Sequence, residues 1–334
     1  MSTVFDRATL IELIDEARRA PSVHNIQPAC WSLGGSGVLG LHADPERRLP
    51  VADSTGHDVR VSLGAACEGM AIALARRGFV AGPAEPAPAE EAAHVAWLPF
   101  ERGTRPDALA DAVHRRAAYR GTFAATDAAA LDRVAGAIGP AGHVLIRDRA
   151  RIRDLAKMAD QAGDEFLRDP AYWRETWHWL RLSRSDPNWN RDGLNADALA
   201  LSGIERVLGR VLMAPPAFES MRKIGLAGAL ISERSKIESA GALILFTAPV
   251  GEDPFVIGRA FYRTWLEVTS CGLALCPISV LSDSKRTHAE IRRLFALPAE
   301  RRLVNVFRVG AAPFGFPKQL TPRLPAEELV FPRP

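Results

Sequence analysis

The sequence predicts a mixed protein of α/β or α+β class. Segments with apolar residues at helical spacing alternate along the chain with short apolar runs that are typical of strands. The 334 residues exceed the usual size of a single core, so two domains or one large unit are expected. A hydrophobic content of 47% is sufficient to build such cores.

The N-terminal region predicts a helix followed by a polar loop. Residues 8–20 place their apolar side chains on one helical face. Pro21 cannot continue this helix because it has no backbone N–H and disfavours helical geometry at the residue before it. The loop PSVHNIQP, residues 21–28, is either a binding loop or a connector in which Ser22 and Asn25 satisfy nearby backbone groups.

Two strands joined by a glycine turn are expected at 30–33 and 38–43. Gly35, Gly37 and Gly40 within this stretch form the pattern G-x-G-x-x-G of dinucleotide-binding loops. That pattern requires a helix directly after it, whereas a strand and a loop follow here. We therefore expect no phosphate-binding role for these glycines.

The next part of the chain, residues 62–123, predicts two helices with a strand between them. Residues 62–79 form a helix rich in small residues, which favours close packing against a second long helix. The Pro/Ala/Glu segment 81–94 is a connector, and a strand follows at 94–100. The stretch 102–123 is expected to contain another helix before a basic, glycine-broken turn. A domain boundary is expected near residue 105.

The second half continues the alternation. The expected elements are helices at 126–138 and 149–168, a strand at 143–148, a buried strand at 238–249, a long helix at 258–275 and a final strand at 302–313.

Residues 171–236 lack a strand pattern and contain four tryptophans, which indicates a helical insertion or lid. In a lid, Trp177 or Trp189 would stack near a substrate. Packing between helices is the favoured alternative, because Trp173 and Trp177 share one helical face.

Composition excludes several classes of protein. The net charge is only +3 and the basic residues are spread among the acidic ones, so nucleic-acid binding is not indicated. No apolar run is long enough to span a bilayer, and the N-terminus does not have the pattern of a signal peptide, which predicts a cytoplasmic protein. The four cysteines lack metal-ligand spacing, so buried thiols and no metal site are expected.

Four segments resemble signatures of the nitroreductase family of FMN-dependent oxidoreductases. They are APSVHNIQP at 20–28, HRRAAYRGTF at 114–123, CGLALCPISVLSD at 271–283, and FRVGAAP at 307–313 followed by PRLP at 322–325. In ordinary members the arginine-containing turn precedes the APSxxNxQPW element, whereas here it follows by about ninety residues. This order resembles the twin-type, Acg-like members, in which two fused halves complete one FMN site.

The resemblance implies an α+β, nitroreductase-like fold with central antiparallel or mixed sheets flanked by helices. Residues 1–105 would form the N-terminal half. Residues 106–334 would form the C-terminal half, with a helical lid insertion at about 171–236. Such a chain would act as a monomeric pseudo-dimer, or as a homodimer.

The resemblance also implies the residues that hold the flavin phosphate and the N1 edge. Arg116 and Arg323 match the family's phosphate-binding positions, and guanidinium groups suit a dianionic phosphate. Arg120 falls where the family places a base near flavin N1 and O2, where positive charge stabilises the reduced ring.

Further positions follow from the same resemblance. Ser22, Asn25 and Gln27 match positions that reach the cofactor from the other half. The backbone N–H groups of Ser279 and Val280 would lie at flavin N5 and O4. The chain departs from the family pattern in three places. Ala29 stands where the family has Trp, Ala118 where it has Ser or Thr, and Ser279 where many dimeric members have an acidic residue.

The function implied is that of an FMN-dependent oxidoreductase. It would pass hydride from NAD(P)H through flavin N5 to a nitro, quinone or similar small acceptor. Because the cofactor carries the chemistry, no residue is assigned a catalytic role, although His24 is a candidate. Two alternatives stay open: a flavin-sequestering or storage protein with little turnover, and a flavin-dependent tailoring dehydrogenase.

Overall fold

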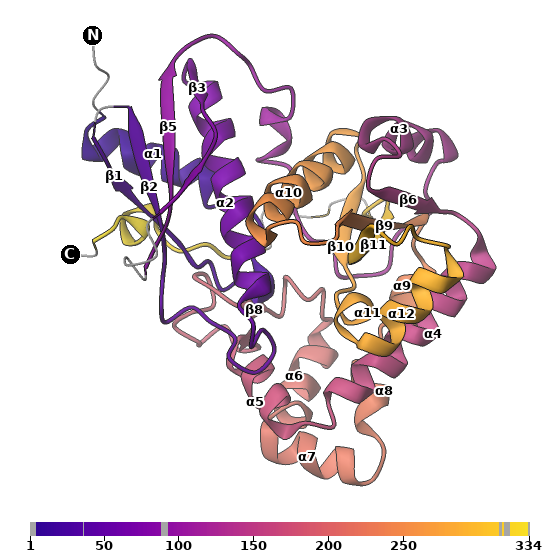
Figure 1. Cartoon of the computed structure of the whole chain (residues 1–334). Helices are drawn as coiled ribbons and strands as arrows, with labels where there is room; N and C mark the ends of the chain where they lie inside the picture. Colours follow the sequence, from indigo (N-terminus) through magenta and orange to yellow (C-terminus); the bar gives the residue numbers. More distant parts are fainter. Residues whose placement is uncertain (1–4, 36, 88–92, 314–315, 317–320, 333–334) are drawn as a thin grey trace.

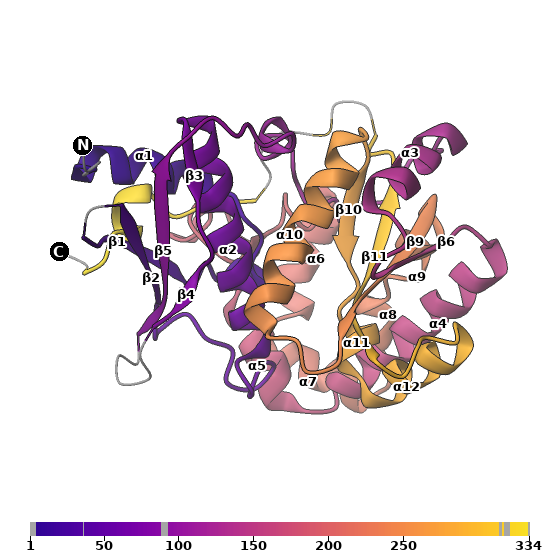
Figure 2. The same cartoon turned by 45° about the horizontal axis from the view of Figure 1, so that its top comes forward.

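The computed structural model describes residues 5–35, 37–87, 93–313, 316 and 321–332 (Figure 1). It contains two antiparallel sheets at opposite ends of the molecule, with helices α2 and α10 between them (Figure 2). The predicted α+β class is confirmed. Within the described part of the chain, no helix combines the length and apolar character needed to cross a membrane.

The N-terminal sheet has the order β1-β2-β5-β3, and β4 also pairs with β5. Its strands are β1 (Ala29–Leu33), β2 (Val38–Ala43), β3 (Phe79–Ala81), β4 (Glu85–Pro86) and β5 (His94–Arg102). Helices α1 (Arg7–Ala17) and α2 (His57–Arg76) bury their apolar faces in the same core as this sheet. The hairpin β1–β2 confirms the expected glycine turn, and no helix follows the G-x-G-x-x-G pattern.

The C-terminal sheet has the order β10-β11-β9-β6. Its strands are β6 (His143–Ile146), β9 (Ala242–Pro249), β10 (Ala274–Pro277) and β11 (Arg301–Gly310). The helices over its two faces are α3 (Ala128–Ile138), α4 (Arg149–Phe166), α10 (Pro254–Ser270), α11 (Val280–Asp283) and α12 (Lys285–Leu294). Strand β9 is apolar on both faces over residues 242–246, because Ile244 and Phe246 pack with α3 and α10, while Leu243 and Leu245 pack with α4 on the other face.

Helices α2 and α10 join the two sheets at an unusually close crossing (Figure 1). A Cβ atom built on Gly64 would lie 1.9 Å from the Phe255 carbonyl oxygen, and one on Gly258 would lie 2.0 Å from the Val61 carbonyl oxygen. The prediction that the small-residue helix packs against a second long helix is therefore confirmed.

Most of the residues between α4 and β9 are helical, as expected for an insertion. This segment, residues 170–238, is called the insertion below and comprises α5 (Pro170–His178), β7 (Leu180–Arg181), β8 (Leu194–Asn195), α6 (Gly203–Leu212), α7 (Pro215–Lys223), α8 (Ala227–Ile231) and α9 (Arg234–Glu238). The Trp173 ring stacks on Phe218 with centroids 4.0 Å apart, so Trp173 packs between helices as favoured from its spacing. His178 is exposed.

Several expectations about element boundaries were wrong. The helix expected within 102–123 is only a 3-10 turn at Ala110–Ala112, because Pro106 lacks an N–H and Asp107 caps Leu109 with its side chain. Helix α10 ends at Ser270, since Gly272 has a left-handed φ of 81° and the following residues form β10. Part of the 81–94 connector forms β4, and its residues 88–92 lie outside the described residues.

Candidate functional site

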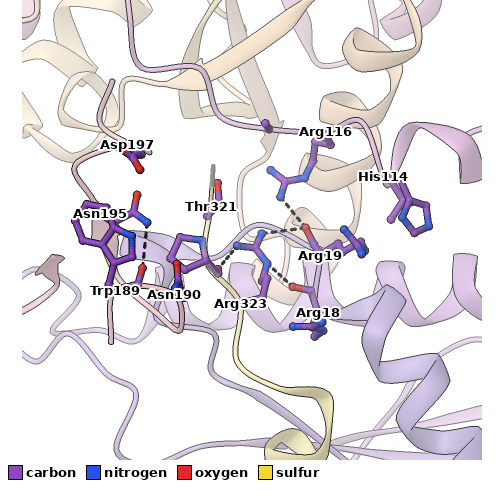
Figure 3. Close-up of a pocket in the computed structure, with 13 residues that line it drawn as sticks. Arg18, Arg19, His114, Arg116, Trp189, Asn190, Asn195, Asp197, Thr321 and Arg323 are labelled. Atoms are coloured by element: carbon purple, nitrogen blue, oxygen red, sulfur yellow. Dashed lines mark hydrogen bonds between the residues drawn. The ribbon is translucent and has the colours of Figure 1, made fainter. Parts of the chain in front are cut away.

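Two adjoining cavities lie between the end of α1 with the loop that follows it, helices α2 and α10, and the insertion. The first, called the arginine cavity, has a volume of about 370 Å³ and contains Arg18, Arg19, Arg116 and Arg323 in its wall (Figure 3). The second, called the aromatic cavity, has a volume of about 240 Å³ and is lined in part by Phe261 and Trp265. Arg116, Thr321 and Arg323 line both cavities, so the two form one continuous site.

Arg116 and Arg323 reach this site from distant parts of the chain and bind the same backbone. Arg116 donates to the Arg19 carbonyl at 2.6 Å, and Arg323 donates to the Arg18 carbonyl at 2.6 Å and to the Arg19 carbonyl at 3.2 Å (Figure 3). These carbonyls follow the last turn of α1, where acceptor groups lack helical partners. The end of α1 therefore holds both guanidinium groups side by side at the cavity.

The arginine pair has no carboxylate counter-charge among the described residues. Among the described residues neither guanidinium forms an ion pair with a carboxylate, and Arg116 Nε and Arg19 Nε have no hydrogen-bond partner. Burial, then the charge of Arg116, holds the pKa of Arg323 well below its usual value. Because guanidinium groups stay protonated in proteins, this repulsion is a cost that a bound anion would relieve. The site has the donor chemistry of a phosphate pocket.

The loop 21–28 is strained and closes the cavity wall. Three of its non-glycine residues have left-handed backbone angles, with φ of 45° at His24, 57° at Asn25 and 54° at Gln27. The Asn25 amide donates to the carbonyls of Gly193 and Pro322 and accepts from Arg323 at 2.8 Å. Strain of this kind persists where the surroundings over-determine it, which is common at ligand sites.

The aromatic cavity combines apolar walls with a few polar groups. Trp265 is 3% exposed, and in the described part of the chain its Nε1 has no hydrogen-bond partner. The Arg116 guanidinium lies 4.8 Å from the centroid of the Trp265 ring. His24 lines the same cavity, and burial together with the charge of Arg120 lowers its pKa to about 4, so its imidazole is neutral at physiological pH.

His57 and Asp58 line one part of the aromatic cavity, and the pKa of Asp58 depends on other acidic residues. Burial and then the charge of Asp53 raise the pKa of Asp58 to about 6, although Asp58 lies in the first turn of α2. Burial and then the charge of Asp58 raise the pKa of Asp283 to about 7. The two carboxyl groups are therefore partly protonated near neutral pH.

The raised pKa of Asp58 predicts a pH-dependent stability. Between about pH 4 and pH 6 the folded protein keeps a proton that the unfolded chain has lost, so this stabilising contribution disappears as the pH rises through about 6. In ligand-free protein, Asp58→Asn should raise the free energy of unfolding by about 1–2 kcal/mol at pH 8 and by little at pH 4. Urea unfolding at both pH values tests this, with Asp132→Asn, an exposed carboxyl on α3, as the control. An equal effect at both pH values would contradict it.

The structure brings six of the eight sequence-predicted residues to one cavity. These are Ser22, Asn25, Arg116, Arg120, Ser279 and Arg323, all of which line the aromatic cavity. Gln27 lies outside both cavities and joins the loop to the rest of the protein, donating to the Arg191 carbonyl and accepting from the Leu324 N–H at 2.9 Å each. Val280 also lies outside them, at the start of α11, where it packs against the core of the C-terminal sheet.

Sequence reasoning missed several cavity residues, namely His57, Asp58, Phe261, Trp265 and Thr321. Phe261 and Trp265 are four residues apart on α10 and hence share a face, which was a usable signal. His57 and Asp58 begin α2 five residues before the predicted start of that helix.

No family model matches the chain. A Mycobacterium tuberculosis protein named "Putative NAD(P)H nitroreductase" is 27% identical, over 99% of this chain and 93% of its own length. A second protein of the same organism, named as uncharacterized, is 27% identical over 94% of this chain and 90% of its own.

Among solved structures, the FMN- and NADPH-dependent nitroreductase NfnB from sphigopyxis sp. strain HMH has a TM-score of 0.40. It is 15% identical and covers 66% of this chain and 97% of its own. The mycobacterial relatives match this chain along nearly the whole length of both chains.

Proposed function

We propose that the protein is an FMN-dependent oxidoreductase that transfers hydride from NAD(P)H to a nitro, quinone or similar small acceptor. The observation that carries this proposal is a pair of arginines, Arg116 buried and Arg323 half-buried, that has no carboxylate partner in the described chain and lies beside an aromatic cavity. The pair fits the phosphate of FMN, and the adjoining cavity fits a planar ring. The small-molecule acceptor and a cytoplasmic location are part of the same proposal.

Different residues of the site would bind the phosphate and the ring of FMN. Arg116 and Arg323 would hold the phosphate, where Arg116 Nε lacks a partner among the described residues. Phe261 and Trp265 provide apolar walls for the ring, and Arg120 provides positive charge beside His24. When bound, FMN would supply two-electron transfer between the nicotinamide and the acceptor.

The chain's own contribution to the chemistry is electrostatic. Arg120 and Arg116 both line the aromatic cavity, so negative charge that develops within it is stabilised by fixed positive groups. His24 is neutral and can donate or accept a hydrogen bond without adding charge. Asp58 can carry a proton near neutral pH at the other end of the cavity, and so can Asp283, whose pKa the charge of Asp58 raises further.

The location of the site supports a twin organisation, with halves at 1–105 and 106–334. Ser22 and Asn25 come from the first segment, whereas Arg116, Ser279 and Arg323 come from the second. One chain therefore contributes both walls, and the proposed reaction needs no second subunit.

The test starts from the visible spectrum of the purified protein. We expect flavin absorbance, about one FMN per chain by mass analysis of the released cofactor, and NADPH-dependent reduction of a nitroaromatic or a quinone. A colourless protein that cannot be reconstituted with FMN would refute the proposal. Bound FMN without turnover would instead favour the sequestering alternative, and substrate-dependent peroxide formation would favour the dehydrogenase.

A further inference from the structure

Helix α6 turns its apolar face to solvent. Ile204, Val207, Leu208 and Val211 are 75%, 65%, 51% and 62% exposed, and their spacing of three and four residues forms one continuous stripe. An amphipathic helix of a globular protein ordinarily turns this stripe towards the core. Here the side of α6 that packs on the insertion carries Gly209, which is buried against Leu182 and Met213.

Further large apolar side chains are exposed on the helices that follow α6. Ile224, Leu226 and Leu230 are also exposed, on the segment from the end of α7 into α8, and Figure 1 shows α6, α7 and α8 together at one end of the molecule. Seven of the eleven large apolar side chains that are exposed in the described chain therefore lie between residues 204 and 230. Apolar concentration of this kind marks an interaction surface.

The charge around these side chains is basic. Residues 203–231 contain four Arg or Lys and two Glu. Arg206 is paired with Asp197 and Arg222 with Glu219. Arg210 and Lys223 are exposed and form no ion pair with any described residue. An apolar stripe flanked by cations without ion-pair partners fits a binding partner whose outer layer is negatively charged and whose interior is apolar.

We propose that the α6–α8 face docks onto an anionic phospholipid surface. The apolar side chains of α6 would enter the boundary between headgroups and acyl chains, and Arg210 and Lys223 would meet the lipid phosphates. The insertion that carries this face also supplies Trp189 and Asn195 to the arginine cavity, so the docked face lies on the segment that walls the site. A second copy of the chain is the competing occupant, which the experiment distinguishes.

The experiment is co-sedimentation of the full-length protein with vesicles of phosphatidylcholine, with and without phosphatidylglycerol. We expect binding to the vesicles that contain phosphatidylglycerol, weakened by salt. Val207→Asp and Leu208→Asp should each weaken it about 10-fold or more, because each places a charge in the apolar stripe. Val256→Asp is the matched control, since Val256 is 48% exposed on α10, outside residues 204–230, and it should bind as the original protein does.

Several results would overturn the proposal. These are no vesicle binding, equal binding by Leu208→Asp and the original protein, or binding that is independent of phosphatidylglycerol. A dimer detected by light scattering that Leu208→Asp dissociates, without vesicle binding, would assign the face to a second copy instead. Because these side chains are exposed, the variants should unfold at the original midpoint, and Leu208→Ser provides a milder change if Leu208→Asp does not.

Discussion

Replacing Arg116 with alanine is expected to lower the affinity for FMN by about 100-fold or more, so that the variant purifies largely without flavin. The Arg116 side chain is buried, lines both cavities and keeps an Nε without a partner among the described residues. Its loss would remove charged hydrogen bonds to the FMN phosphate. Because the position is buried, water would not easily take the place of the guanidinium group. Equilibrium titration of flavin-free protein with FMN measures the effect.

The same substitution is expected to leave the flavin-free protein as stable as before or more stable. Burial and the neighbouring charges of Arg120 and Arg19 lower the pKa of Arg116, and Arg116 in turn lowers that of Arg323. Removing one of these like charges relieves the repulsion. Arg116→Ala should therefore bind FMN weakly while melting at an equal or higher temperature, a combination that a folding defect cannot produce.

Two further variants serve as comparisons for Arg116→Ala. Arg115→Ala removes an exposed neighbour, whose Nε donates only to the Asp111 carbonyl at 3.3 Å, and should bind FMN normally. Arg116→Lys keeps the charge but loses the fork of donors, so an intermediate affinity is expected. Full flavin retention by Arg116→Ala would show that the arginine cavity does not hold the phosphate.

The parts of the fold that the sequence predicted well are those in which one local pattern decides the structure. The run 242–246 is apolar on both faces, and it lies in the buried strand β9 between two helical layers. Gly64 and its small neighbours on α2 could pack closely only against another helix, and α10 fills that role. Pro21 was expected to end the first helix, and α1 ends at Ala17, a few residues before it.

The features that the sequence did not reveal depend on contacts far along the chain. Residues 102–123 carry helical spacing, but Leu109, Ala112 and Val113 instead dock as a turned segment against α2 and α10. Gln27 reads as a ligand residue by its place in the loop. Its partners Arg191 and Leu324 come from the insertion and the C-terminal segment, which no local pattern reveals.

Replacing Gly64 with alanine is expected to cost about 3 kcal/mol or more of unfolding free energy. The new Cβ would lie 1.9 Å from the Phe255 carbonyl oxygen, a backbone atom near the start of α10 that cannot rotate away. Helices α2 and α10 would have to separate, which disturbs the packing of Ala65 against Tyr262 and Leu266. Urea unfolding measures the loss.

The Gly64 variant should also weaken flavin binding, because Val61 and Ala65 of α2 and Phe261 and Trp265 of α10 face the same cavity. Gly136→Ala is the matched control. Gly136 lies within α3, and nothing lies within 4 Å of a Cβ built there, so alanine should stabilise by about 0.5–1 kcal/mol through its helix propensity.

Gly258→Ala completes the test, because its Cβ would meet the Val61 carbonyl oxygen at 2.0 Å from the opposite helix. Each substitution forces the same two helices apart, so the double variant should lose less stability than the two single losses added together. Additive losses would mean that the two glycines act at independent contacts. A Gly64→Ala protein with the original unfolding midpoint would mean that α2 and α10 do not cross as closely as the structure shows. The two helices would then not form the shared cavity wall in the way described above.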